Sequence, residues 1–150
     1  MTIGIALKYK TGVVLGSDSQ VTLGDAPYKA QGTKIEQIGK RVGLVAAGSI
    51  DFYKEIVRRL HDRREEIDNV DIQVVTDMVS QTMAELYMIL TNRFGKRAIE
   101  EVVPLATVGV LVGGINQDGK PNVFSLRPPG IYGPEDNYGT VGSGIFYAGM

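Results

Sequence analysis

The chain has 150 residues, 43% of them hydrophobic and 22% charged, and its formal net charge is −1. This composition predicts a single globular domain over residues 1–150 and excludes a disordered or fibrous chain. The balanced charge gives no electrostatic reason to expect a nucleic acid or an anionic membrane as partner.

Two residue types that often carry catalysis are absent or scarce. The chain has no cysteine, which excludes disulfides, thiolate nucleophiles and cysteine-ligated zinc. Its one histidine, His61, lies in the arginine-rich segment 58–64, which is typical of a solvated helix face, so a Ser-His-Asp triad is not expected. No apolar run reaches the roughly 18 residues of a membrane span, and no signal peptide is recognisable, so we expect a cytoplasmic protein.

The first fifty residues alternate short apolar runs with glycine-containing turns. Residues 2–7 and 13–17 predict one β-hairpin, and residues 34–38 and 42–47 predict a second. The run 42–47 is almost continuously apolar, which is typical of a strand covered on both faces.

The hydrophobic period changes from 2 to 3.6 after residue 50. Asp51 is placed to cap an amphipathic helix that reaches Ile67, and Asp71 opens a second helix that stops at Gly95. We interpret the Met and Leu stripe of the second helix as core packing rather than as a cofactor site. The stripe consists of Val75, Val79, Met83, Leu86 and Leu90.

Strand patterns return in the last third of the chain. Residues 105–115, 121–126 and 138–141 predict strands, and residues 145–148 predict the first turn of a helix. Residues 127–134 are rich in proline and glycine and predict a loop without regular structure. The order of strands, two helices and strands predicts an α+β sandwich with helices on its outer faces.

The N-terminus offers a nucleophile and a base in one residue. Removal of Met1 would leave Thr2 with a free α-amino group beside its own hydroxyl. An α-amine has a pKa of roughly 7.7 to 8.0, so it can accept the hydroxyl proton near neutral pH.

Four segments, 2–7, 12–22, 33–35 and 46–49, resemble the first third of a proteasome β-type subunit. Several coincident spacings are more specific than any one short motif. Counted from the threonine, the spacings of an aspartate, a lysine and a glycine match those of the family's catalytic aspartate, catalytic lysine and oxyanion-hole glycine. These residues are Asp18, Lys34 and Gly48, which lie 16, 32 and 46 residues after Thr2.

Two later segments extend the resemblance over almost the whole chain. Residues 108–114 and 138–144 resemble later strands of the same fold, and Ser143 falls on the family's active-site serine. The resemblance implies a four-layer αββα sandwich of the N-terminal-nucleophile hydrolase type, with two antiparallel sheets. Family members continue beyond the point that matches Met150, so the resemblance also implies that a C-terminal part is missing.

The resemblance assigns a chemical role to each matched residue. Thr2 would attack the peptide carbonyl, and the positive charge of Lys34 would favour loss of its proton. Asp18 would hold the Lys34 ammonium by a charge-assisted hydrogen bond. The backbone N–H of Gly48 would bind the oxyanion, since a residue without a side chain permits close approach. Each residue by itself also fits a purely structural role.

The resemblance further implies a substrate-binding surface. Thr22 and Gly48 lie where backbone groups would pair with an extended peptide. Packing is an alternative role for all of these side chains. The residues that would line the pocket for the side chain before the cleaved bond are Val21, Gly32, Glu36, Ala46, Ile50 and Lys54.

The implied function is that of a threonine endopeptidase that needs no metal or organic cofactor. Its partners would be polypeptide substrates and like subunits in a ring, with α-type subunits or an unfoldase ATPase beside them. The charged face of residues 58–66 could fix the register of neighbouring subunits. Two alternatives stay open: another N-terminal-nucleophile amidase or transpeptidase, and a non-catalytic structural subunit or inactive fragment.

Overall fold

The computed structural model describes residues 3–23, 26–28, 30–31, 34–95 and 108–142. The predicted strand residues 105–107 and the predicted helical turn 145–148 lie outside these ranges, as do Thr2, Gly32 and Ser143.

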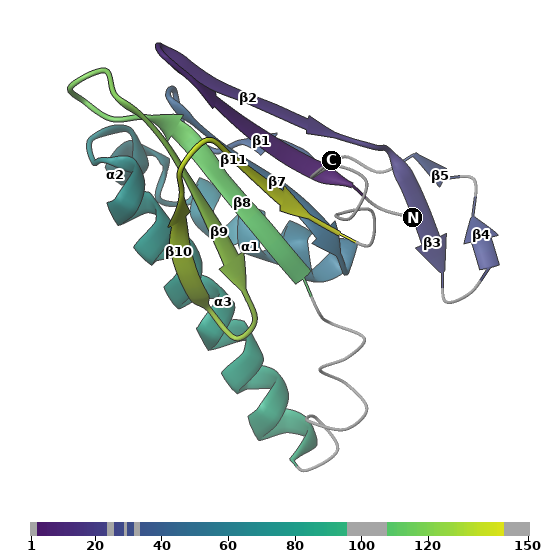
Figure 1. Ribbon diagram of the computed structural model, residues 1–150. Coiled ribbons are helices and arrows are strands. Elements are labelled where there is room, and N and C mark those ends of the chain that lie inside the picture. Colours follow the sequence, from purple (N-terminus) through teal and green to yellow (C-terminus); the bar gives the residue numbers. More distant parts are fainter. Residues whose placement is uncertain (1–2, 24–25, 29, 32–33, 96–107, 143–150) are drawn as a thin grey trace.

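The first predicted hairpin forms the centre of a three-stranded antiparallel sheet (Figure 1). Strand β1 (Gly4–Tyr9) lies between β2 (Gly12–Ser17) and β11 (Tyr138–Val141). In this register Ala6 is opposite Leu15 on one side and Gly139 on the other. The first and last parts of the described chain are therefore neighbours in one sheet.

The second predicted hairpin, β6 (Ile35–Gln37) and β7 (Val42–Gly48), forms one edge of a five-stranded antiparallel sheet. The remaining strands are β8 (Val108–Ile115), β9 (Pro121–Arg127) and β10 (Ile131–Glu135), in the order β10-β9-β8-β7-β6. Every pairing in this sheet is antiparallel.

The loop predicted for residues 127–134 is wrong for its second half, because residues 131–134 belong to β10. Among the described strands, β10 lies at the edge of the sheet and pairs only with β9. An edge strand tolerates Pro134, because only one of its two sides takes part in the hydrogen-bond ladder.

A small third sheet was not predicted from the sequence. It consists of β4 (Ala26–Tyr28), β3 (Gln20–Leu23) and β5 (Ala30–Gln31), in that order. Figure 1 shows these strands projecting beyond the ends of the two larger sheets.

The predicted first helix is divided into α1 (Ile50–His61) and α2 (Arg64–Asp68). The break follows from a tighter turn, in which the Arg63 N–H donates to the Leu60 carbonyl three residues earlier. Ile67 is nevertheless buried, as the helical stripe predicted. His61 is exposed, which confirms its place on a solvated face.

The residue that caps α1 also differs from the prediction. The cap is Ser49, whose Oγ accepts a hydrogen bond from the Phe52 N–H at 3.3 Å, and Asp51 lies inside the first turn. The other long helix, α3 (Ile72–Phe94), begins after Asp71 and ends at Gly95 as predicted.

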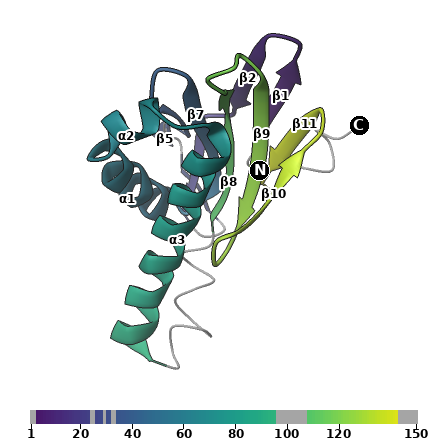
Figure 2. The ribbon, with the colours of Figure 1, turned by 90° about the vertical axis from the view of Figure 1, so that its left-hand side faces the viewer.

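The two large sheets stack, and the helices cover only one of them in the described chain (Figure 2). Alternate residues of β7 therefore face two different cores. Leu44 and Ala46 belong to the cluster beneath α1 and α3, whereas Val45 and Ala47 belong to the cluster between the sheets. The prediction that this strand is covered on both faces is confirmed.

The outer face of the β11-β1-β2 sheet carries apolar side chains that are exposed among the described residues. Leu7 is opposite both Val14 and Tyr138, and Tyr9 lies two residues further along β1. In the described chain the strand β2 also pairs on one side only. No helix within the described ranges is long and apolar enough to cross a membrane.

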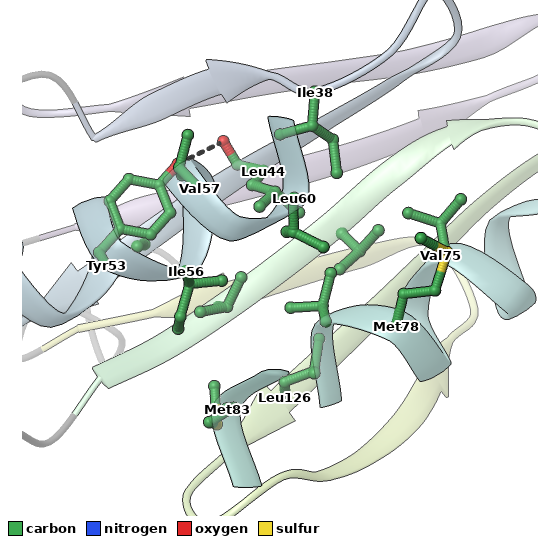
Figure 3. Close-up of a cluster of buried hydrophobic side chains, with 14 of the residues drawn as sticks. Ile38, Leu44, Tyr53, Ile56, Val57, Leu60, Val75, Met78, Met83 and Leu126 are labelled. Carbon is green, nitrogen blue, oxygen red and sulfur yellow. Dashed lines mark hydrogen bonds between the residues drawn. The ribbon is translucent and has the colours of Figure 1, made fainter. Parts of the chain in front are cut away.

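The helix-side cluster, shown in Figure 3, should supply much of the stability of the fold. Leu60 of α1 is fully buried there, so we expect Leu60→Ala to lower the free energy of unfolding by about 2 to 5 kcal/mol. Urea unfolding followed by circular dichroism measures this loss. Met88→Ala is the control, since Met88 is 60% exposed on α3, and its effect should stay within about 0.5 kcal/mol. Equal effects of the two substitutions would contradict the packing.

Candidate active site

Asp18 and Lys34 form an ion pair at one end of the sheet sandwich. Lys34 Nζ lies 3.1 Å from Asp18 Oδ2, and the two side chains are 4% and 29% exposed, respectively. Asp18 directly follows β2, and Lys34 directly precedes β6. The stacking of the two sheets thus brings together two residues that are sixteen positions apart in sequence.

The carboxylate of Asp18 also holds the first described residue of the chain. Its Oδ1 accepts a hydrogen bond from the Ile3 N–H at 2.9 Å, and the Asp18 N–H donates to the Ile3 carbonyl at 3.1 Å. One oxygen of Asp18 therefore binds the main chain of the residue after Thr2, while the other binds the Lys34 ammonium. A single side chain links the N-terminal segment to the buried cation.

Gly48 ends the strand beside Lys34. The Ala46 N–H donates to the Lys34 carbonyl at 3.0 Å, and successive amides of a strand point to opposite neighbours. The Ala47 N–H therefore points towards β8, and the Gly48 N–H towards the side of β6 and Lys34. Gly48 has a φ of 115°, a left-handed conformation that favours glycine because it has no Cβ.

Four predicted pocket residues lie on neighbouring elements. Ala46 is buried in the cluster beneath the helices, so packing accounts for its small size. Glu36 is half-buried on β6. Ile50 is half-buried and Lys54 exposed, one turn apart on the same face of α1. Among the described residues, neither Glu36 nor Lys54 forms an ion pair within 4.0 Å.

The buried Tyr53 of α1 binds the main chain of Leu44, the residue opposite Glu36 in the β6–β7 hairpin. Its hydroxyl donates to the Leu44 carbonyl at 3.3 Å, a bond drawn in Figure 3. Burial raises the pKa of the Tyr53 phenol well above its usual range, and the nearby Glu36 carboxylate acts in the same direction. The phenol therefore stays neutral and serves as a hydrogen-bond donor at physiological pH.

For two further predicted residues the structure gives the strand and its register. Val21 and Thr22 lie on β3, opposite Ala30 of β5 and Pro27 of β4, respectively. Thr2, Gly32 and Ser143 lie outside the described residues.

Two features near the site were missed from the sequence. The Ile3 N–H has no side-chain signature, because any residue except proline offers it. Ser49 did carry a signal, since a serine directly before an amphipathic segment is a preferred N-cap. Asp51, two residues later, fits the same pattern, so the sequence alone does not separate the two.

A cavity lies away from Asp18, Lys34 and Gly48. A space of about 590 Å³ lies between β9, β10 and β11, and the Ser125 hydroxyl on its wall donates to Glu135 at 2.7 Å. None of the predicted site residues that the structure describes lines it. Within the described ranges no three His, Cys, Asp or Glu side chains gather to hold a metal ion.

Comparison with known proteins gives consistent results. A family model described as "Proteasome subunit" matches residues 2–149. Proteasome subunit beta 2 of Pyrococcus furiosus is 31% identical over 147 residues, which cover 98% of this chain and 65% of that protein. Proteasome subunit beta of Methanospirillum hungatei is 29% identical over 149 residues, covering 95% and 62%. The chain thus spans less than two thirds of the length of these curated relatives.

The chain also superposes on solved structures. Anbu (ancestral beta-subunit) from Yersinia bercovieri superposes with a TM-score of 0.73 at 20% identity, over 96% of this chain and 62% of that one. A likeness at this identity shows the fold, which is the two-sheet sandwich of the N-terminal-nucleophile hydrolases. The family model, which matches nearly every residue, establishes that this chain belongs to the proteasome subunit family.

Proposed function

We propose that the chain is a threonine peptidase subunit that cleaves unfolded polypeptides through Thr2 after removal of Met1. The observation that carries this proposal is the double attachment of Asp18, to the Lys34 ammonium at 3.1 Å and to the Ile3 N–H at 2.9 Å. This arrangement holds a cation and the start of the chain in a fixed relation. A nucleophile at the N-terminus requires such a fixed relation to its activating charge.

The first half of the reaction would form an acyl-enzyme. The Thr2 hydroxyl oxygen bonds to the substrate carbonyl carbon, and its proton passes to the Thr2 α-amine, by way of a water molecule. The charge that develops on the carbonyl oxygen is stabilised by the Gly48 N–H. Collapse of the tetrahedral intermediate breaks the C–N bond, and the departing amine takes the proton from the α-ammonium.

The second half would release the acyl group. A water molecule gives a proton to the α-amine and attacks the ester carbon, and the Gly48 N–H again binds the oxyanion. The bond to the Thr2 oxygen then breaks, and that oxygen recovers its proton. Lys34 forms no bond to the substrate in this mechanism and acts by its charge.

The substrate would bind beside this centre as an extended segment. We assign its main-chain pairing to the backbone of Thr22 and Gly48. The positions of four assigned pocket residues support this assignment. They lie on β6, β7 and the first turns of α1, the elements on either side of Gly48. The side chain before the cleaved bond would contact Val21, Gly32, Glu36, Ala46, Ile50 and Lys54.

We further propose that the subunit works in the cytoplasm in a closed ring of like subunits, with α-type subunits or an unfoldase ATPase delivering the substrate. Heterologous contacts between identical subunits form a ring when the rotation between neighbours closes on itself. The exposed face of α1 offers fixed charges for such contacts, since Glu55 binds Arg58 at 2.7 Å and Arg59 at 3.0 Å. Hydrogen bonds from both arginines lower the pKa of the Glu55 carboxyl to about 2, so it is ionised at neutral pH.

Removal of Met1 tests this proposal directly. We expect intact-mass measurement of active full-length protein to show loss of the initiator methionine, because the α-amine of Thr2 is the proposed base. The same preparation should hydrolyse fluorogenic peptides and an unstructured protein such as casein. Active protein that retained Met1 would contradict the mechanism, because its Thr2 would have no free α-amine.

Light scattering should show the full-length protein as rings with six or seven subunits in a layer. A stable monomer that still hydrolysed peptides would rule out a compartment and favour the amidase or transpeptidase alternative. Rings that lacked Met1 and hydrolysed neither probe would favour a structural subunit.

A further inference from the structure

The turn between β7 and α1 carries the N–H that the proposed mechanism needs. Gly48 ends the strand, and α1 begins two residues later at Ile50. The peptide plane between Ala47 and Gly48 sets the direction of the Gly48 N–H. Because Gly48 has no Cβ and a φ of 115°, its own backbone preferences restrain that plane only weakly. Another group must therefore fix the turn.

The strand and the helix on either side of the turn are held firmly. On the strand side, the Ala46 N–H donates to the Lys34 carbonyl at 3.0 Å. On the helix side, the ring of Phe52 packs on that of Tyr87 with a centroid distance of 4.7 Å. The Tyr53 hydroxyl bonds the helix back to the Leu44 carbonyl on β7. Gly48 lies between them and has no side chain by which the turn could be anchored.

Ser49 joins the two parts. Its Oγ accepts the Phe52 N–H at 3.3 Å, and its carbonyl accepts the Tyr53 N–H at 3.1 Å. The backbone of Ser49 is extended, with φ −66° and ψ 111°, as an N-cap residue requires. Two acceptors of one residue thus tie the end of the Gly48 turn to the first turn of α1.

We propose that Ser49 is a positioning residue for the oxyanion-binding N–H of Gly48. This inference rests on the proposed function. The cap holds the Gly48–Ser49 peptide against the fixed helix, and the Gly48 N–H keeps its direction towards the Lys34 side of the sheet. Without the Oγ, the first turn of α1 loses one of its two bonds to Ser49, and rotation about the Gly48 backbone is less restrained.

Steady-state kinetics on the full-length protein test the inference. Ser49→Ala should lower kcat about tenfold, because misdirecting an oxyanion donor weakens a contact made mainly in the transition state. KM should change by less than about twofold, since ground-state binding does not need that contact. Ser49→Thr keeps a capping oxygen and should restore kcat.

The matched control is Ser80→Ala. Ser80 is also half-buried, and its hydroxyl donates to a main-chain carbonyl, that of Gly130, in the turn between β9 and β10. This variant loses one serine–backbone bond elsewhere and should keep the wild-type kcat. Melting temperatures of all three variants check that the fold is retained.

A second readout does not depend on catalysis. In hydrogen-exchange mass spectrometry, Ser49→Ala should speed exchange in peptides covering residues 47–53 about tenfold, while Ser80→Ala leaves that segment unchanged. If the wild-type protein is active and Ser49→Ala has the same kcat and the same exchange rate as the wild type, the positioning role is overturned and the proposed function is not. A wild-type protein without Met1 that hydrolysed no peptide would overturn the proposed function, and with it any catalytic purpose of Ser49.

Discussion

Replacement of Thr2 with alanine should abolish peptide hydrolysis, with a fall in kcat on the order of 10⁴-fold or more. The substitution removes the only proposed nucleophile, and neither the Lys34 charge nor the Gly48 N–H can form an acyl-enzyme without it. Hydrolysis of a fluorogenic peptide by assembled protein, with loss of Met1 verified by intact mass, measures the effect.

Thr11→Ala provides the matched control for this experiment. Thr11 is exposed in the turn between β1 and β2, so its loss should leave both turnover and melting temperature unchanged. Thr2→Ser should keep part of the activity, since serine supplies a hydroxyl beside the same α-amine. Turnover near the wild-type level in Thr2→Ala would show that the nucleophile lies elsewhere.

Replacement of Lys34 should have the next largest effect, a fall in kcat of about 10³-fold for Lys34→Ala. The 4% exposed ammonium places a positive charge beside Asp18, and in the proposed mechanism that charge favours the ionised form of the Thr2 hydroxyl. Lys34→Met separates charge from packing, because it keeps most of the side-chain volume and removes the ammonium. Lys10→Ala is the control, since Lys10 is exposed in the β1–β2 turn.

The two Lys34 variants should lose activity equally and differ in stability. Lys34→Met should keep a melting temperature closer to the wild type, because it leaves a smaller cavity than alanine. Activity retained in Lys34→Met would contradict an electrostatic role and leave Lys34 with a packing role. Asp18→Asn completes the series: its amide oxygen can still accept the Ile3 N–H, so its defect measures the charge that holds Lys34.

The sequence by itself determined the larger elements of the fold. The alternation of residues 2–7 and 13–17 predicted the β1–β2 hairpin, and the unbroken run 42–47 predicted a strand buried on both faces. The end of α3 at Gly95 followed from a glycine after the last apolar position. These signals are local, since burial of one face imposes a period of 2 on a strand and of 3.6 on a helix.

Local signals failed where neighbouring elements decided the outcome. Residues 131–134 contain glycine and proline, yet they form β10 because they pair with β9. A strand at the edge of a sheet needs hydrogen bonds on one side only, so it tolerates proline. The break between α1 and α2 at residues 62–63 interrupts a continuous helical stripe. Ser49 and Asp51 both fit a cap, and the bend at Gly48 selected Ser49.

The candidate site also has features that the sequence predicts and features that depend on the tertiary structure. The spacing of Thr2, Asp18, Lys34 and Gly48 could be read along the chain, because a family resemblance is a property of sequence. The 3.1 Å ion pair of Asp18 and Lys34 depends on how the sheet of β1 and β2 stacks on the sheet of β6 and β7. The bond from Ile3 to Asp18 and the direction of the Gly48 N–H depend on the register of the β1–β2 and β6–β7 hairpins. Sequence order cannot supply the ion-pair distance, since only the packing of two sheets brings Asp18 and Lys34 into contact, and it does not fix the exact register of either hairpin.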